Sequence, residues 1–225
     1  MSENKLPSWT AVLAVVAHPD DESFGLGAVL SAFIDAGARA TVLCLTRGEA
    51  STLHGVPGEL ATVRAAELRA AAQALGIDDV RLLDYPDGGL ADVPLASLAA
   101  RVGDEASEIA ADGLLVFCSD GVTGHPDHMR ATAAASAAAQ WRGVGALAWT
   151  LPAAVAQQLT DEYGADFLGH LDDDVDLVIE VDRTHQREAV ARHPSQAVPG
   201  SVLWRRLELL GDHEHLRWLV RPPQE

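Results

Sequence analysis

Short apolar runs alternate along the chain with longer segments in which apolar residues recur at helical spacing. The runs are nearly continuous, which is typical of strands buried on both faces of a sheet. Strands are predicted in this way over residues 10–17, 40–46, 80–84, 113–118 and 145–150. Helices are predicted between them over residues 24–36, 59–75, 94–111 and 127–139. This order implies an α/β fold: a three-layer, Rossmann-like, mostly parallel sheet with helices on both faces.

Beyond residue 150 the alternation becomes less regular. We predict a strand over 176–182, helices over 184–192 and 200–210, and a late strand over 215–220. Residues 151–175, with the acidic run LDDDVD, match no pattern and are expected to govern the choice of substrate. Because no repeat and no linker interrupts the chain, we expect one domain over residues 1–225 with an irregular C-terminal portion.

Polar clusters follow four successive predicted strands, at the point where each strand ends. They read HPDDE after the first strand, TRGEAST after the second, YPDGG after the third and SDGVTGHPDH after the fourth. In an open parallel sheet, ligands bind beyond the carboxyl ends of the strands. Loops that carry charged and hydrogen-bonding groups at such an edge are where sites are built. We therefore expect these four loops to surround one functional site.

The composition narrows the classes of function. The chain has 225 residues, of which 48% are hydrophobic and 22% charged, as in globular proteins with a sizeable core. Its formal net charge of −17 repels phosphate backbones and anionic lipid, so no nucleic-acid or membrane partner is expected. No apolar stretch could span a bilayer, and the N-terminal sequence MSENKLPSW lacks the order of a secretory signal. The expected location is cytoplasmic, and a homo-oligomer is compatible with the sequence.

Cysteines and scattered histidines are expected to play structural parts only. Cys44 and Cys118 both lie in apolar runs and should be buried thiols rather than a disulfide or a metal pair. Five further histidines are expected at surface or packing positions: His54, His170, His185, His213 and His215.

Two pairs of metal-binding residue types stand three positions apart, His18 with Asp21 and His125 with His128. Residues at this spacing lie on one face of a first helical turn. Imidazoles and a carboxylate that leave one position for water are typical of a catalytic zinc site, and iron(II) or another divalent metal fits the same ligands. Acids near a helix N-terminus would explain the acids of HPDDE but not its histidine. Two such segments on one sheet rim are harder to attribute to chance than either alone.

The motifs, in their order, resemble those of the PIG-L/LmbE-like family of metal-dependent de-N-acetylases. AHPDDE at 17–22 and GHPDH at 124–128 carry the resemblance, and LTRGE, RAAE, LG, YPDG and HPSQ continue it as far as residue 196. The first motif and GHPDH are specific together, whereas TRGE or YPDG alone would be weak. The family acts on N-acetyl groups of amino sugars and sugar conjugates. The resemblance thus implies a zinc-dependent hydrolase that removes an N-acetyl or N-acyl group from a small amino sugar or sugar conjugate.

The resemblance also implies which residues hold the metal and the substrate. His18, Asp21 and His128 look like the zinc ligands. Arg47 and Asp87, on the second and third loops, would bind sugar hydroxyls or polar groups of the conjugate. For Asp87, an ordinary turn aspartate in P-D-G is a serious alternative.

Three further residues receive catalytic roles from the resemblance. Asp20 looks like the general base, which takes a proton from water that zinc has acidified toward a pKa of about 7. His125 looks like the electrophilic partner of the oxyanion, kept protonated by Asp127 beside it. Glu22 contacts the substrate, supports another group of the site, or caps the helix; the sequence leaves these three alternatives level.

Some features leave alternatives open. A tyrosine precedes GHPDH in the mycothiol branch, whereas this chain has Thr123, so a mycothiol substrate is not favoured. His193 either approaches the site or stabilises the C-terminal part. A non-catalytic metal- or sugar-binding module on the same fold would need neither Asp20 nor His125. A phosphohydrolase with an aspartate nucleophile would not need His128, and the net charge does not favour its substrates.

Overall fold

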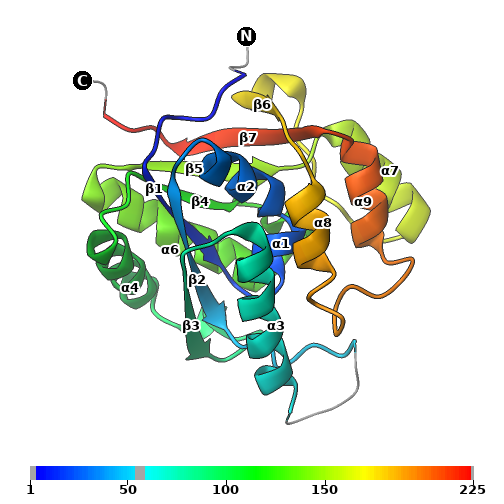
Figure 1. The fold of residues 1–225 in the computed structure, drawn as a ribbon, viewed down its shortest axis with the longest axis horizontal. Helices are drawn as coiled ribbons and strands as arrows, with labels where there is room; N and C mark the ends of the chain where they lie inside the picture. The colour runs from blue at the N-terminus through cyan, green and yellow to red at the C-terminus, as the bar shows by residue number, and fades with distance from the viewer. Residues whose placement is uncertain (1–3, 54–58, 224–225) are drawn as a thin grey trace.

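Seven strands form one mixed sheet in the computed structural model, which describes residues 4–53 and 59–223 (Figure 1). Their order across the sheet is β3-β2-β1-β4-β5-β7-β6. The strands are β1 (Ala11–Val16), β2 (Arg39–Thr46), β3 (Asp79–Tyr85), β4 (Gly113–Phe117), β5 (Gly145–Thr150), β6 (Leu177–Glu180) and β7 (His213–Val220). The strands β1 to β5 are parallel, and β7 runs antiparallel to both of its neighbours, β5 and β6. The predicted fold class is therefore confirmed. The predicted late strand, β7, lies between β5 and the edge strand β6.

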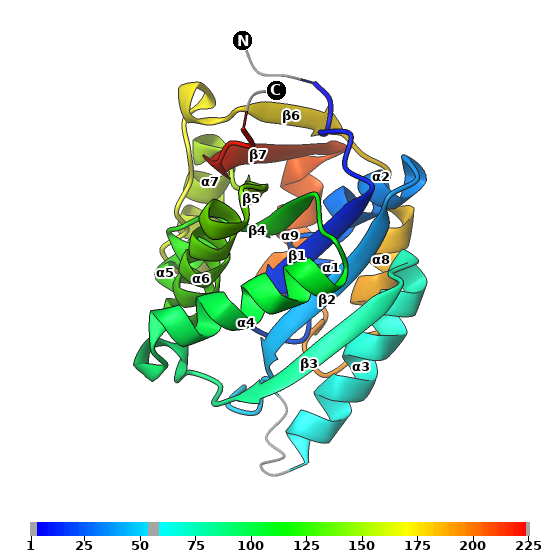
Figure 2. The same ribbon diagram turned by 90° about the vertical axis from the view of Figure 1, so that its left-hand side faces the viewer.

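Helices cover both faces of the sheet, as the turned view in Figure 2 shows. The α-helices are α1 (Asp21–Phe24), α2 (Gly27–Asp35), α3 (Leu60–Leu75), α4 (Leu95–Glu108), α5 (Gly121–Gly124), α6 (Pro126–Arg142), α7 (Ala153–Tyr163), α8 (Thr184–Val190) and α9 (Val202–Leu210). Two 3₁₀ turns, η1 (Leu90–Asp92) and η2 (Asp172–Asp174), complete the elements.

The residues of β1 explain why both faces are covered. All six are buried, and they alternate between two cores, Val12 and Ala14 on one side and Leu13 and Val15 on the other. The first core takes in α2, α3, α7, α8 and α9, and the second takes in α4 and α6. A strand with apolar side chains on both faces must lie between two helical layers. The loop that follows β1 therefore begins inside the sheet, between the ends of β2 and β4.

Two helical predictions differ from the structure. The helix predicted over 24–36 is interrupted: α1 ends at Phe24 and α2 begins at Gly27, and the Phe117 ring packs against Gly25 between them. A Cβ at Gly25 would lie 2.1 Å from Cε1 of that ring. The second difference is α7, which lies in the segment without a predicted element. Its signals were Pro152 before the first turn and Gly164 as a left-handed cap.

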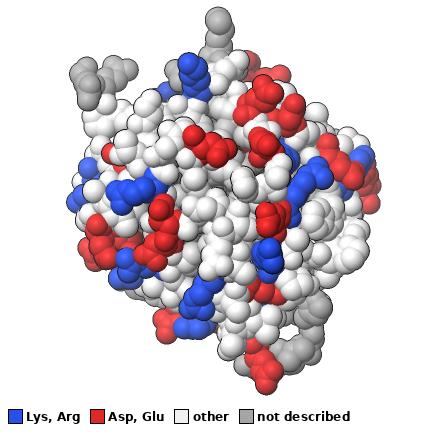
Figure 3. All heavy atoms as spheres, viewed as in Figure 1, with Lys and Arg blue, Asp and Glu red and all other residues white. Residues whose placement is uncertain are grey.

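Within the described residues, no helix is both long and apolar enough to cross a membrane. Both cysteines are buried free thiols, as predicted. On the face shown in Figure 3, basic side chains lie among acidic ones rather than in one patch. His54 lies outside the described residues, and His185 and His213 are exposed as expected.

Gly113 begins β4 at a point where the strand meets an indole. It pairs with Val12 of β1 and Gly145 of β5. A Cβ at Gly113 would lie 2.1 Å from Cζ2 of Trp9. The Trp9 ring cannot retreat easily, because it stacks on Phe33 with ring centroids 5.4 Å apart.

We therefore expect Gly113→Ala to lower the free energy of unfolding by about 1–3 kcal/mol, the usual cost of overpacking. Urea unfolding measures this change. Gly103→Ala is the matched control, because a Cβ in the middle of α4 would only touch Ala138 at 4.0 Å. That substitution should raise stability by about 0.5–1 kcal/mol. A Gly113→Ala protein as stable as the parent would contradict the packing described for Trp9.

Candidate metal centre

The loops that follow β1, β2, β3 and β4 meet at one edge of the sheet, where they surround a pocket of about 530 Å³. Its lining includes six of the predicted site residues, His18, Asp20, Asp21, Asp87, His125 and His128. These four loops therefore surround one pocket, as the sequence predicted. Thr123 and Phe167 also line the pocket, so the region 151–175 reaches it through Phe167.

Three of these side chains present metal-binding atoms to one another. His18 Nδ1 lies 3.2 Å from His128 Nε2, and His128 Nε2 lies 3.2 Å from Asp21 Oδ1. The other oxygen of Asp21 is occupied, because it accepts the backbone N–H of His18 at 2.9 Å. Two imidazole nitrogens and one carboxylate oxygen in such proximity are the donor set of a catalytic zinc site. We call His18, Asp21 and His128 the metal triad.

The remaining nitrogen of each triad imidazole faces an oxygen atom. His18 Nε2 lies 3.0 Å from Asp87 Oδ1 and 3.4 Å from Asp127 Oδ2. His128 Nδ1 lies 3.3 Å from the Gly121 carbonyl oxygen, to which it can donate. Histidines that bind metals usually donate their second ring proton in this manner, which fixes the tautomer and the ring orientation. The surroundings of the triad thus fit a divalent cation.

The charges around the triad also suit a cation. Burial lowers the pKa of His18, but the carboxylates of Asp127, Asp87 and Asp21 outweigh burial and raise it to about 10. Burial raises the pKa of Asp21, yet His128 and His18 hold it well below its usual range. The raised pKa of His18 shows that the surrounding carboxylates stabilise positive charge here, and the lowered pKa of Asp21 keeps its carboxylate ionised.

A strained turn presents His125 and His128. Asp120 caps α5 by accepting the backbone N–H of Val122 at 2.8 Å, and Val122 adopts a left-handed φ of 69°. The chain then reverses into α6, whose first helical residue is Pro126. His125 Nδ1 accepts the backbone N–H of Asp127 at 3.2 Å and so caps α6. Because Nδ1 accepts, the proton of a neutral His125 resides on Nε2.

This arrangement corrects the predicted link between Asp127 and His125. The Asp127 carboxylate accepts the backbone N–H groups of Gly88 and Leu90, at 2.7 and 3.1 Å, and faces His18 rather than the His125 ring. Burial and the neighbouring imidazoles of His128 and His18 lower the pKa of His125, and Asp127 offsets them only in part. His125 is therefore not held in the protonated form by contact with Asp127.

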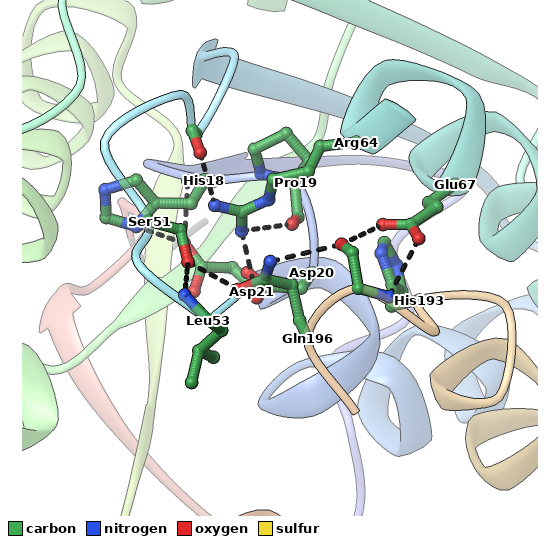
Figure 4. Close-up of polar contacts among 12 residues, drawn as sticks. His18, Pro19, Asp20, Asp21, Ser51, Leu53, Arg64, Glu67, His193 and Gln196 are labelled. Atoms are coloured by element: carbon green, nitrogen blue, oxygen red, sulfur yellow. Dashed lines mark hydrogen bonds and ion pairs between the residues drawn. The ribbon is translucent and has the colours of Figure 1, made fainter. Parts of the chain in front are cut away.

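Asp20 is the third acid-base group of the pocket and lies in a strained conformation. Its φ is 136°, and its backbone N–H donates to Glu22 Oε2 at 2.9 Å. One carboxylate oxygen, Oδ2, lies 3.0 Å from Nη2 of Arg64 (Figure 4). Burial raises the pKa of Asp20 to about 6, even though Arg64 lowers it. Its carboxylate is thus ionised at neutral pH and more basic than that of an exposed aspartate.

Arg64 is a site residue to which the sequence analysis assigned no role. It is buried, donates to the Gly48 carbonyl at 2.8 Å and the Pro19 carbonyl at 2.6 Å, and pairs with Asp20. A side chain at Gly48 would collide with the guanidinium, since its Cβ would lie 2.2 Å from Nη1. Arg47, by contrast, is exposed and does not line the pocket. The structure thus places Arg64, rather than Arg47, in the pocket lining, and the substrate-binding role of Arg47 stays a prediction.

Glu22 and His193 form a buried pair behind Asp20. Both side chains have 0% exposure, and His193 Nε2 donates to Glu22 Oε1 at 2.7 Å. A fully buried Glu22 cannot touch a substrate, so of its three predicted roles the structure leaves two, the support of another group and the capping of α1, where Glu22 accepts the N–H of the N-cap residue Asp20. The next residues along the chain, Ser195 and Gln196, bind Glu67 and Ser51 respectively (Figure 4). His193 thus belongs to a segment that anchors the C-terminal part against α1 and α3.

A second group of metal-binding side chains consists of Cys118, Asp120 and His170. His170 Nε2 lies 2.6 Å from Asp120 Oδ2 and 3.2 Å from Cys118 Sγ. Arg217 Nη1 lies 2.8 Å from His170 Nδ1, and an arginine can only donate there. The His170 ring proton is therefore on Nε2 and faces Asp120, so this group forms a hydrogen-bonded chain rather than a metal site. His170 is more than the surface or packing residue predicted, because it fixes the residue that caps α5.

Comparisons with known proteins agree with this geometry. The profile of the family described as GlcNAc-PI de-N-acetylase, PIG-L, matches residues 13–139. A 1D-myo-inositol 2-acetamido-2-deoxy-alpha-D-glucopyranoside deacetylase of Mycobacterium sp. (strain KMS) is 31% identical over 223 residues, which cover 80% of this chain and 71% of that protein. The deacetylase with the same name from Kineococcus radiotolerans is 33% identical over 150 residues, so that this chain spans less than half of that protein: the match covers 53% of this chain and 42% of the relative.

Solved structures share the fold at lower identity. The A40926 pseudoaglycone deacetylase Dbv21 superposes with a TM-score of 0.70 at 24% identity, covering 96% of this chain and 99% of that chain. A 4-carboxy-2-hydroxymuconate hydratase from Pseudomonas putida KT2440 superposes almost as well, with a TM-score of 0.67 at 18% identity and coverage of 96% and 98%. The architecture is thus common to a deacetylase and a hydratase. The profile match covers more than half of this chain and takes in the metal triad, Asp20 and Arg64, and the chain accordingly belongs to the PIG-L family.

Proposed function

We propose that this protein is a metal-dependent deacetylase that removes the N-acetyl group of an amino sugar conjugate. The observation that carries the proposal is the position of Asp20, a largely buried carboxylate paired with Arg64 beside a triad that can hold zinc. The relatives in the PIG-L family whose names describe glucosaminide deacetylases support the same reaction class. The partner of the protein would then be a small N-acetylated sugar conjugate.

The metal triad would hold Zn²⁺, or Fe²⁺ or another divalent metal with the same ligand preferences. When bound, such a metal polarises the amide carbonyl and acidifies water in the pocket. The triad contributes one negative charge, from Asp21, and two neutral imidazoles. Asp87 and Asp127 would hold the His18 ring in the orientation that directs Nδ1 to the metal.

Asp20 would act as the general base. Its Oδ2 is engaged by Arg64, which leaves Oδ1 to accept a proton from the attacking water. A base with a pKa near the working pH combines the correct charge state with a useful driving force for proton transfer. Glu22 and His193 would position Asp20 by holding its backbone N–H in the strained turn.

His125 would donate to the developing oxyanion as a neutral imidazole. Its Nδ1 already accepts the Asp127 N–H, so its only ring proton is on Nε2. A donor of this kind contributes about 3 kcal/mol to transition-state stabilisation in other acyl-transfer sites. In this role His125 is still the electrophilic partner of the oxyanion, but it acts as a neutral imidazole and does not need Asp127 to keep it protonated.

A non-catalytic binding module on the same fold remains the alternative. Burial beside Asp21 opposes ionisation of the Asp20 carboxylate, and a module that only binds would gain nothing from that cost. We therefore favour catalysis, and assays of metal content and turnover distinguish the two.

We expect His128→Ala to lose stoichiometric zinc after dialysis, because one of three ligands is removed. Elemental analysis measures zinc per chain. The matched control is His170→Ala, which removes the histidine of the Cys118 group and should keep one equivalent. Full zinc retention in His128→Ala, or its loss in His170→Ala only, would move the metal site to the other group.

Asp20→Asn should keep the metal and the fold but lower kcat by about 10²–10⁴-fold, because an amide cannot take the proton of water. The measurement is steady-state amine release from an N-acetylated amino sugar conjugate by the zinc-loaded protein. A kcat near that of the parent protein would exclude Asp20 as the base. No amine release by the parent itself, across such conjugates, would favour the binding module.

Arg64→Ala should lower kcat/KM by about tenfold or more, because Asp20 and two buried carbonyls each lose a donor. Arg47→Ala is the matched control, and its kcat/KM should stay within about threefold of the parent, as expected for an exposed side chain. Thermal unfolding of both variants separates a loss of folding from a loss of function. If Arg47→Ala were as damaging as Arg64→Ala, Arg47 would regain its predicted role.

A further inference from the structure

The pocket has two chemically different walls, with the metal triad between them. Ser51, Arg64, Asp87 and Gln196 form a polar wall, in which Ser51 Oγ donates to Gln196 Oε1 at 3.0 Å. Phe24, Phe117, Val122, Phe167 and Val202 form an apolar wall. The apolar wall begins at the triad itself, because the Phe117 ring lies 4.9 Å from the His128 ring.

Arg206 is the cation of the apolar wall. It lies one helical turn after Val202 on α9 and lines the pocket. Its Nη2 donates to the Phe24 carbonyl oxygen, the last carbonyl of α1. Its guanidinium lies over Trp149, with Cζ 5.0 Å from the ring centroid. Trp149 in turn contacts Phe117, with ring centroids 5.6 Å apart, so aromatic rings connect Arg206 to the metal triad.

No carboxylate among the described residues forms an ion pair with Arg206. Glu214, the carboxylate with the largest effect on Arg206, is fully used, because Arg183 Nη1 and Trp149 Nε1 donate to its two oxygens. Within the described residues, the Nε atom of Arg206 is buried and has no acceptor. Burial lowers the pKa of Arg206 to about 10, although Glu214, Asp21 and Asp20 raise it. Arg206 is thus a partly exposed cation of the pocket wall with an unused donor.

A cation that is largely withdrawn from water and forms no direct ion pair is stabilised by a ligand of opposite charge. Support of α1 does not explain the charge, since a neutral side chain could donate to one carbonyl equally well. The neighbouring arginine shows the contrast: Arg205 pairs with Glu162 and Glu208 at the surface.

We propose that Arg206 forms an anion subsite in the pocket, which binds a carboxylate carried by the substrate. This inference rests on the proposed function and narrows its substrate class to acidic N-acylated amino sugars. The carboxylate could be at the end of the acyl group or on the sugar. A planar guanidinium with free donors matches a carboxylate, and the apolar wall would hold the carbon chain that leads to it.

Two pairs of ligands test the subsite. N-succinylglucosamine carries a carboxylate on the acyl group, and its terminal carboxamide is the neutral partner. N-acetylmuramic acid carries one on the sugar, and its primary amide is the neutral partner. Calorimetric titration of zinc-loaded protein with Asp20→Asn, which blocks turnover, gives the Kd of each. In at least one pair, we expect the acid to bind about tenfold or more tightly than the amide, as for charge-assisted hydrogen bonds.

Arg206→Gln in the same background should abolish this preference, and Arg205→Gln, the matched control, should retain it. If Arg206→Gln does not fold, Arg206→Lys replaces it and should reduce the preference at least threefold. Equal affinities for acid and amide in both pairs overturn the subsite, as does a preference that survives substitution of Arg206. Hydrolysis is measured separately with the parent enzyme, so a failure of the proposed function is distinguishable from a failure of the subsite.

Discussion

Three consecutive carboxylates, Asp20, Asp21 and Glu22, are largely or fully buried at the carboxyl end of β1, and each requires a partner. An unpaired buried charge costs several kcal/mol, and removing one partner of a buried pair costs about 3–5 kcal/mol. The three partners come from different parts of the chain: Arg64 from α3, His128 from α6 and His193 from the C-terminal part. This need for compensation joins distant segments around one short turn.

The turn also explains how adjacent acids acquire different chemistry. Asp20 has a φ of 136°, which sends its side chain toward Arg64 while Asp21 faces the imidazoles. Strain of this kind persists only where the surroundings over-determine the backbone. Here the Glu22 carboxylate supplies that restraint through the Asp20 N–H, and His193 holds Glu22. Desolvation then raises the pKa of Asp20, whereas two imidazoles lower that of Asp21. One residue is suited to move a proton and its neighbour to bind a cation.

The sequence predicted what depends on local pattern. Continuous apolar runs located five parallel strands, and parallel topology alone brings HPDDE and GHPDH to one edge. The sequence could not show which side chains form pairs across long separations. Glu22 and His193 are 171 positions apart, and no periodicity links them. The contact of Arg64 with Asp20 was missed for a related reason. Arg47 lies in a loop beside the motif, whereas Arg64 reaches the pocket from a helix, and a side chain's direction depends on packing. The prediction that Asp127 contacts His125 was wrong because a backbone N–H group of the YPDGG loop binds the Asp127 carboxylate, and a pattern of residue types does not show backbone donors.

The pocket residues come from two parts of the chain. One part holds the residues proposed for the reaction, and the other holds residues that could select the substrate. Residues 13–139, matched by the family profile, contain the metal triad, Asp20, His125 and Arg64. Phe167, Gln196, Val202 and Arg206 lie beyond that span and line the same pocket. They are held there by separate contacts: Phe167 N donates to Thr160, Gln196 accepts from Ser51, and Arg206 donates to the end of α1. Substitutions in this second group can reshape the pocket without touching the triad, because no triad residue depends on them for a hydrogen bond. Substitutions in the C-terminal part of the chain could therefore change the substrate while leaving the metal triad unchanged.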